Sequence, residues 1–348
     1  MKVLYDYQIF SFQKFGGISR YFYEIMKSNI NYDIAILFNQ NSYCNKGIRI
    51  NKAFRITNLL NKFYSKSQLA YKNYDIFHPT YYETYFLDTL KKPFVLTIHD
   101  MIHEKFPELF YKGDKTSEKK RLLANKADRI IAVSNQTKLD IIDILNISEE
   151  KIDVIYHGSD FNLLEEDKEF SKNLPKKYIL YVGTRNDYKN FINFIKSSYI
   201  FLNKDVELFI ICAGGGKFRD DEIDLFKRFK IENQLIHYSC NDKQLKSLYI
   251  HSLFFIFPSL YEGFGIPLLE AMACNTPILC SNTSCFPEIV QDSALMFNPY
   301  SIEDIKEKIR FALYKDLSNF IIKGTRRFTD FSWDKARSET NNVYRKLL

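Results

Sequence analysis

Several common classes of protein are excluded by what this chain lacks. Its 348 residues contain no Cys-x-x-Cys pair and no zinc-finger spacing of cysteine and histidine. No apolar run reaches the roughly 18 residues that a membrane-spanning helix needs. No Gly-x-Gly-x-x-Gly fingerprint is present, since the glycines of the segment AGGGKFR (213–219) are followed by Lys-Phe-Arg. A dehydrogenase that uses a nicotinamide cofactor is therefore poorly supported.

The cysteines are few and lie mostly in apolar runs. The six are Cys44, Cys212, Cys240, Cys274, Cys280 and Cys285. This placement predicts free, mostly buried thiols and a reducing compartment. The opening residues MKVLYDYQIF form a strand pattern and not a signal peptide. We therefore expect a cytoplasmic protein.

Positive charge is in mild excess and is scattered. The net charge of +7 is too small and too dispersed to indicate a nucleic-acid partner. The segment 111–129 is more basic than the rest, and its cations are Lys112, Lys115, Lys119, Lys120, Arg121, Lys126 and Arg129. Two interpretations stay open for it: a solvated helix face, or a surface that meets anionic lipid headgroups at the inner face of a membrane.

Short apolar runs alternate with helical patterns along the chain, which predicts parallel sheets covered by helices on both faces. The expected strands are Val3–Tyr7, Ile34–Phe38, Ile76–His78, Phe94–Ile98, Ile130–Val133, Val154–Tyr156, Tyr178–Val182, Val206–Cys212, Leu235–Tyr238, Leu253–Phe257, Ile278–Cys280 and Ala294–Phe297. Helices are expected at Ser19–Asn29 and Phe191–Leu202.

The strongest break in this alternation is the charged segment 161–177, which contains Pro175 and is interpreted as a linker. We therefore expect two doubly wound α/β domains, residues 1–165 and 166–331. A terminal helix over 332–348, capped by Ser332, is expected to pack back on the first domain.

Ligands of open parallel sheets bind beyond the carboxyl ends of the strands, so chemistry is sought in the loops there and in the cleft between the two domains. Gly16 and Gly17 open one such loop and can bring backbone close to a ligand, although they are equally well explained as a turn. His99 ends a strand and can donate a hydrogen bond or carry a proton, or else serve the core. No matching set of carboxylates accompanies His99 and His103, so no metal site is expected.

Two cations follow the strand at 178–182. Arg185 and Lys189 stand before a helix, where they could hold a diphosphate or be ordinary surface charges.

The segment 259–281 places two carboxylates around a glycine-rich turn. Glu262 is expected in the loop, Pro267 at the start of a helix and Glu270 in its first turn. Each glutamate alone has an ordinary structural explanation. Together with Gly263 and Gly265, which expose the backbone, they suit a ligand that carries a diphosphate flanked by vicinal hydroxyls. A nucleotide sugar has this chemistry.

These residues resemble those of family 4 glycosyltransferases. The stretch from Glu262 to Glu270 matches the family's Glu-x7-Glu signature, and the segments ISRYF (18–22), TIHDMIHEKFPELF (97–110), AVSNQTKLDI (132–141) and VIYHGSD (154–160) are similar to family segments in the same order. The resemblance covers nearly the whole chain. It implies the GT-B fold, with two Rossmann-like domains facing across a cleft.

The resemblance also implies roles for individual residues. Glu262 would hold hydroxyls of the donor sugar and Glu270 the ribose, while Arg185 and Lys189 would neutralise the diphosphate. Further contacts are implied for His99 beside the transferred sugar and for backbone at Gly16, Gly17, Gly263, Phe264, Gly265 and Ile266. Two departures are visible: Thr184 stands where the family often has arginine, and His157–Asp160 differs from the family's Asn-Gly-Val/Ile-Asp.

The function implied is retaining transfer of a hexose, of mannose or rhamnose type, from a GDP-, UDP- or dTDP-linked sugar to a glycan or lipid-linked acceptor in cell-surface polysaccharide or lipopolysaccharide synthesis. No metal and no other cofactor is expected. Three alternatives remain at this point: a sugar-nucleotide epimerase of the same fold, a PLP-dependent phosphorylase of the same fold, and a non-catalytic partner of another glycosyltransferase.

Overall fold

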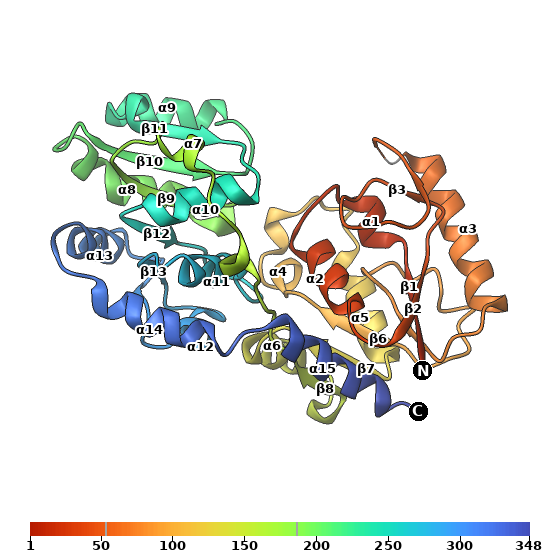
Figure 1. Ribbon diagram of the computed structural model, residues 1–348. Coiled ribbons are helices and arrows are strands. Elements are labelled where there is room, and N and C mark those ends of the chain that lie inside the picture. Colours follow the sequence, from red (N-terminus) through yellow and green to blue (C-terminus); the bar gives the residue numbers. More distant parts are fainter. Residues whose placement is uncertain (53, 186) are drawn as a thin grey trace. The chain divides into compact units, whose positions relative to one another are not determined.

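The chain folds into two compact units. A computed structural model describes residues 1–52, 54–185 and 187–348. Unit 1 comprises Met1–Gly158 and Trp333–Leu348, and unit 2 comprises Ser159–Ser332 (Figure 1). The change from unit 1 to unit 2 falls between Gly158 and Ser159, a few residues before the expected boundary at 165/166.

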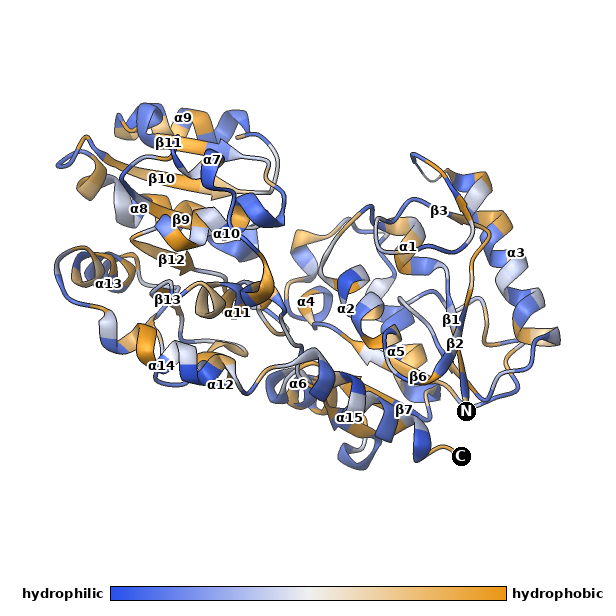
Figure 2. Ribbon diagram, in the orientation of Figure 1, coloured by the Kyte–Doolittle hydropathy of each residue, from blue (hydrophilic) through white to orange (hydrophobic). Residues whose placement is uncertain are grey.

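Unit 1 is built on parallel strands, and its central strands are buried along almost their whole length. Its strands run in the orders β2-β1-β5 and β6-β7-β8, and a parallel bridge between Phe77 and Phe94 joins the two sets. Their bounds are β1 Lys2–Asp6, β2 Asn31–Ala35, β5 Ile76–His78, β6 Val95–Ile98, β7 Arg129–Ala132 and β8 Ile152–Val154, and β3 Phe38–Asn39 pairs with β4 Ile48–Arg49. Such strands consist largely of apolar residues because helices cover both of their faces, as the colouring of β6 shows (Figure 2).

Helices of unit 1 follow most of its strands. They are α1 Gln8–Phe12, α2 Gly17–Met26, α3 Arg55–Tyr71, α4 Ile102–Lys105, α5 Thr116–Lys126, α6 Asn135–Leu145 and α15 Trp333–Arg345, with short 3-10 turns at Pro107–Leu109 and Glu149–Lys151. The short helix α1 stands between β1 and Gly16, which the sequence did not predict.

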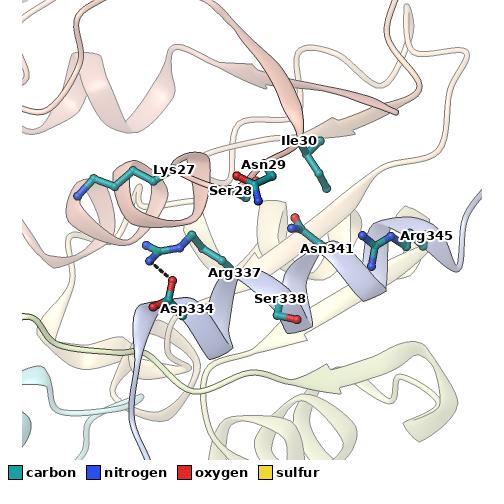
Figure 3. Close-up of a pocket in the computed structure, with 9 residues that line it drawn as sticks. All are labelled: Lys27, Ser28, Asn29, Ile30, Asp334, Arg337, Ser338, Asn341 and Arg345. Atoms are coloured by element: carbon teal, nitrogen blue, oxygen red, sulfur yellow. Dashed lines mark hydrogen bonds and ion pairs between the residues drawn. The ribbon is translucent and has the colours of Figure 1, made fainter.

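The terminal helix α15 belongs to unit 1 and packs against α2. Buried Glu24 on α2 accepts hydrogen bonds from Lys27 at 2.8 and 2.9 Å and from Arg337 at 3.4 Å, and Arg337 also donates to Asp334 at 2.7 Å. Figure 3 shows Lys27, Asp334 and Arg337 beside a polar pocket of about 340 Å³ between the end of α2 and α15. One carboxylate thus joins two helices that are more than 300 residues apart.

Unit 2 is a six-stranded parallel sheet in the order β11-β10-β9-β12-β13-β14. Its strands are β9 Lys177–Val182, β10 Leu208–Ala213, β11 Leu235–Tyr238, β12 Phe254–Phe257, β13 Ile278–Ser281 and β14 Leu295–Phe297. Its helices are α7 Lys168–Ser171, α8 Phe191–Leu202, α9 Asp220–Phe229, α10 Asp242–His251, α11 Ile266–Ala273, α12 Phe286–Val290, α13 Ile302–Tyr314 and α14 Ser318–Phe328, with 3-10 turns at Phe161–Leu163, Asp187–Lys189 and Glu232–Gln234.

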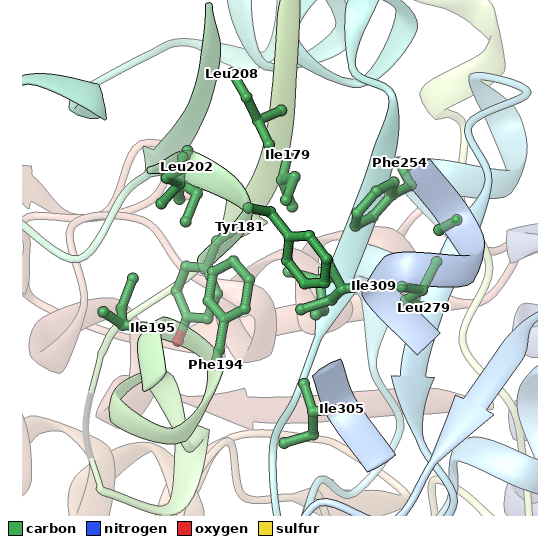
Figure 4. Packing of buried hydrophobic residues seen from close by; sticks show 14 of the residues in the cluster. Ile179, Tyr181, Phe194, Ile195, Leu202, Leu208, Phe254, Leu279, Ile305 and Ile309 are labelled. Carbon is green, nitrogen blue, oxygen red and sulfur yellow. The ribbon is translucent and has the colours of Figure 1, made fainter. Parts of the chain in front are cut away.

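One face of this sheet forms a core with α8 and α13. Ile179 and Tyr181 of β9 point to the same face because strand residues alternate, and they meet Phe194 of α8 and Ile305 of α13 in one buried cluster (Figure 4). This packing fixes β9 at the centre of the sheet, where its carboxyl end carries the loop with Arg185 and Lys189.

The expected strands are all present, most within one or two residues. β2 lies three residues earlier than expected, and the two-residue strands β3 and β4 were not predicted. The segment 161–177 is not a linker. It packs within unit 2, where Lys246 donates to the carbonyls of Asn162 and Leu164 and Ser247 bonds to Asp167.

The six cysteines are all free, as predicted, and only Cys240 is less than fully buried. Within the part of the chain that the structure describes, no helix is both long and apolar enough to cross a membrane.

The junction of α2 and α15 gives a first prediction. Arg337→Ala should lower the free energy of unfolding by about 1–3 kcal/mol, because buried Glu24 loses one of its two cations. Urea unfolding at neutral pH measures the change. The matched control is Arg345→Ala on the same helix, where the exposed guanidinium contacts Asn342, and a change within about 0.5 kcal/mol is expected. Equal losses in both variants would contradict the assigned role of Arg337.

Candidate active site

Two of the residues predicted for the donor, Lys189 and Glu262, meet at the carboxyl edge of the unit 2 sheet. Strands β9 and β12 are neighbours there, and the strand order reverses between them, which is where open α/β sheets bind ligands. Lys189 lies in the loop after β9 and Glu262 in the loop after β12. Their side chains form an ion pair with little exposure, although the two residues are 73 positions apart.

The loop that carries Glu262 is held by serines. Ser259 donates a hydrogen bond to the Glu262 carboxylate at 2.7 Å. Ser284, which follows β13, accepts from the Glu262 peptide N–H at 3.2 Å and donates to its carbonyl at 2.6 Å. The carboxylate therefore has a fixed position. Neither serine was predicted from the sequence, where the position of Ser259, three residues before Glu262, was the one local signal for them.

Glu270 lies on α11 and is buried. The sequence predicted Glu270 in the first turn of the helix. It lies in the second turn, because α11 begins at Ile266. Tyr249 of α10 donates to its carboxylate at 3.1 Å. Burial, and then the negative charge of Glu270, raises the pKa of Tyr249 well above its ordinary value, so this phenol stays protonated as a donor. Tyr249, like the two serines, was not predicted from the sequence.

The turn before α11 requires glycine at one position. Gly265 caps the helix with φ of 88°, a left-handed conformation that other residues rarely adopt. Pro267 occupies the first turn, as predicted, and has no N–H to offer. The N–H of Leu268 bonds to the Gly265 carbonyl, whereas that of Ile266 has no partner among the described residues. The ring of Phe264 is buried and packs against Phe331, so this side chain does not face solvent.

Arg185 is placed differently from the prediction. Its side chain is 1% exposed and pairs with fully buried Glu222 at 2.9 Å. The same guanidinium donates to the carbonyls of Gly214, Gly216 and Lys217 at 2.8–3.3 Å. Most of its donors are therefore directed at the glycine loop that follows β10. This geometry supports a role in positioning that loop, and not the predicted direct contact with a diphosphate.

Gly16 and Gly17 start helix α2 in unit 1. Gly16 is the residue before the helix, and its carbonyl accepts from the Arg20 N–H and from the Ser19 hydroxyl. A side chain at Gly16 would meet the amide oxygen of Gln13 at 2.5 Å. The pair thus forms a tight helix entry, and the proposed contact with phosphate stays a prediction.

His99 follows β6 in unit 1 and is almost fully buried. Its backbone N–H donates to the Tyr82 hydroxyl at 3.1 Å, while its ring nitrogen Nε2 has no partner among the described residues. Burial, reinforced by His78 and Lys120, lowers the pKa of His99 to about 3. The imidazole is therefore neutral near pH 7, and it can donate or accept one hydrogen bond but is not a cationic acid.

The basic segment 111–129 does not present all its cations to solvent. Lys120 is fully buried, bonding to the Asp100 carbonyl and to Glu104 at 2.9 and 2.8 Å, so its predicted place on a lipid-facing surface is wrong. Lys119 pairs with Glu83, and Arg121 donates to the Ile144 carbonyl. In the described ranges no three His, Cys, Asp or Glu residues gather closely enough to hold a metal ion.

Solved structures of low sequence identity share this architecture, which is the GT-B fold. Sucrose-phosphate synthase from Thermosynechococcus elongatus superposes with a TM-score of 0.79 at 16% identity, covering 99% of this chain and 98% of the other. Anabaena Alr3699/HepE in complex with UDP gives 0.76 at 15% identity over the full length of both chains.

Two family models match the sequence. Residues 32–163 match Glycosyltransferase Family 4 and residues 164–327 match Glycosyl transferases group 1. Together the two models span residues 32–327, so the chain is a glycosyltransferase with a family 4 domain followed by a group 1 domain. Similar proteins include O-antigen chain mannosyltransferase B of Escherichia coli, 28% identical over 80% of this chain and 75% of the other. Another is O-antigen chain mannosyltransferase RfbU of Salmonella typhimurium, 29% identical over 59% of this chain and 56% of the other.

The burial of Arg185 leads to a prediction about stability. Arg185→Met should cost about 3–5 kcal/mol of unfolding free energy, because Glu222 remains buried without its main partner. Urea unfolding measures this loss. The double variant Arg185→Met/Glu222→Met should recover much of it, since no charge is then left behind. If the single variant were as stable as the wild type, the fold would not need the guanidinium, and the predicted contact of Arg185 with a ligand would be open again.

The buried histidine makes a prediction for acid stability. The unfolded chain protonates His99 below about pH 6.5, whereas the folded chain does so only near pH 3. Stability from this residue is therefore complete above pH 6.5 and is lost as the pH falls toward 3, with about 2 kcal/mol gone at about pH 5. His99→Gln should flatten the dependence of urea-unfolding free energy on pH over this range. Parallel profiles for the variant and the wild type would contradict the lowered pKa.

Proposed function

We propose that the protein transfers mannose, with retention of the anomeric configuration, from a nucleoside-diphosphate mannose to a hydroxyl of a growing cell-surface glycan or its lipid-linked form. The observation that carries this proposal is the Lys189–Glu262 pair at the point where the strand order of unit 2 reverses. A cation and a carboxylate held side by side there can serve the two unlike parts of a nucleotide sugar, its diphosphate and its hydroxyl groups.

The diphosphate develops negative charge as the bond to the anomeric carbon breaks. Lys189 would stabilise that charge directly, and the N–H of Ile266 at the start of α11 would add a backbone donor. Arg185 would contribute by fixing the loop of Gly214–Lys217 beside the site. Loss of one such donor commonly raises a barrier by about 2.7–4 kcal/mol.

The two glutamates would set the distance between the sugar and the nucleoside. Glu262, held by Ser259, would accept hydrogen bonds from the transferred hexose, and Glu270, held by Tyr249, from the ribose. His99 of unit 1 would use its neutral ring to bond a sugar hydroxyl, and Gly16 and Gly17 would face the phosphate and the acceptor. Positive charge from Lys189 and the helix terminus offers an alternative to a metal ion, and we propose that no metal or other cofactor takes part.

Mannose is proposed because relatives over most of the chain are named O-antigen mannosyltransferases. The nucleoside is left to experiment. The UDP bound in the Anabaena structure belongs to a protein of 15% identity, and it supports a nucleoside diphosphate as the leaving group without selecting its base.

The test combines binding and transfer. Thermal-shift assays with GDP-, UDP-, ADP- and dTDP-sugars should show one stabilising donor, because a ligand that binds the folded state raises its unfolding temperature. Transfer from that donor to an acceptor glycan should then fall about 100-fold or more in Lys189→Ala and Glu262→Ala. EDTA should leave wild-type transfer unchanged, and product analysis should show the α-anomer from an α-linked donor.

Lys196→Ala provides the matched control, since this exposed lysine lies on α8 in the same unit. Its transfer rate should equal that of the wild type. Undiminished transfer in both site variants would overturn the proposal. Conversion of the donor to an epimer without an acceptor would identify an epimerase, and donor binding without any turnover would identify a non-catalytic partner.

A further inference from the structure

A long segment of unit 1 carries positive charge only. Between Asp33 and Asp75 the sequence has no acidic residue, and its cations are Lys46, Arg49, Lys52, Arg55, Lys62, Lys66 and Lys72. Lys66 and Lys72 have acidic partners in Asp88 and Asp33, but no ion pair to an acidic group is recorded among the described residues for Arg55 or Lys62. This segment includes the 17-residue helix α3.

Helix α3 points its apolar residues outward. Ile56, Leu59, Leu60 and Phe63 are exposed by 67%, 50%, 42% and 61%. Their spacing of three and four residues places them on one stripe of the helix, because successive residues turn by about 100°. Exposed Phe54 precedes this stripe and exposed Tyr71 ends the helix. α3 lies at the outside of unit 1, and its ribbon carries patches of apolar colour (Figures 1 and 2).

The inward face of the same helix is largely polar. Buried Asn61 accepts hydrogen bonds from the N–H groups of Leu37 and Phe38 and donates to the Phe38 carbonyl. Ser65, one turn further on, shares a 2.6 Å hydrogen bond with the Tyr85 hydroxyl. The helix is therefore docked by hydrogen bonds, and most of its large apolar side chains take no part in the core. A surface helix of a globular protein normally has the reverse arrangement.

Basic side chains line one edge of the apolar stripe. On a helix of 3.6 residues per turn, Arg55, Lys62 and Lys66 fall within about 40° of one another and next to Leu59. An apolar stripe with lysine and arginine along its border, and aromatic residues at its ends, is the arrangement that helices lying in a lipid–water interface use.

We propose that the outward face of α3, defined by Ile56, Leu59, Leu60 and Phe63 with Arg55 and Lys62, docks on the surface of a bilayer that contains anionic lipid. The apolar side chains would enter the headgroup region, and the two cations would meet lipid phosphates. This surface is separate from the donor site of unit 2, so it neither requires the proposed reaction nor follows from it.

Charge decides between a bilayer and a second copy of this chain. In a two-fold symmetric dimer the same patch would face itself, so the interface would hold the cations of both α3 helices. No acidic residue lies within the segment 34–74 to offset them. An anionic lipid surface offers both the apolar contact and the opposite charge.

The experiment measures sedimentation of the full chain with vesicles of phosphatidylcholine, with and without phosphatidylglycerol. Wild-type protein should bind the anionic vesicles and should bind more weakly at high salt. Two variants test the two parts of the surface: Leu59→Ser/Phe63→Ser for the apolar stripe and Arg55→Gln/Lys62→Gln for the charged border. Each should lower the partition coefficient about tenfold or more. Circular dichroism and thermal unfolding should match the wild type, because these side chains are exposed.

Matched controls come from elsewhere on unit 1. Leu139→Ser removes an apolar side chain of similar exposure on α6, and Lys112→Gln/Lys115→Gln removes two exposed cations from segment 111–129. Both should bind vesicles within about twofold of the wild type. The proposal is overturned if wild-type protein ignores anionic vesicles or if the α3 variants bind as well as the controls. It is also overturned if light scattering shows a wild-type dimer that the α3 variants dissociate, which would identify a second copy as the occupant.

Discussion

The ion pair between Lys189 and Glu262 connects the two loops on which the unit 2 site depends. Each loop follows a different strand, and the strands are neighbours only because the chain returns to the centre of the sheet at β12. A carboxylate near a helix N-terminus would ordinarily compete with a bound phosphate for the same positive end. Here a lysine already offsets the charge of Glu262, so the carboxylate could stay beside the proposed phosphate and keep lone pairs for hydroxyl donors.

The two cations of the loop after β9 show why arginine and lysine are not equivalent. Arg185 has a planar fork of five N–H groups, which suits it to gather several carbonyls and a carboxylate in the interior. Lys189 has a single ammonium on a flexible stem, which can exchange one partner for another. A residue that organises a loop and a residue that can transfer its charge to a ligand are thus placed four positions apart.

Much of the fold could be predicted because buried parallel strands read as short apolar runs, and the twelve expected strands are present. The two-residue strands β3 and β4 were missed because so short a run carries no period. Burial of Arg185 could not be predicted, since its partner Glu222 lies 37 positions further on and on another element. The segment 161–177 looked like a linker because it is charged, yet the carbonyls of its first turn are bound by Lys246, which composition does not reveal.

Helix α3 illustrates a more general limit of sequence patterns. A period of 3.6 residues shows that a helix has two unlike faces, but it does not show which face meets the core. In unit 1 that choice is made by the edge of the sheet after β2, where the backbone groups of Leu37 and Phe38 need partners and Asn61 supplies them. Because the polar face of α3 is bonded to unit 1, the apolar face of the same helix points outward. The fold of unit 1 therefore does not account for the apolar residues on that face.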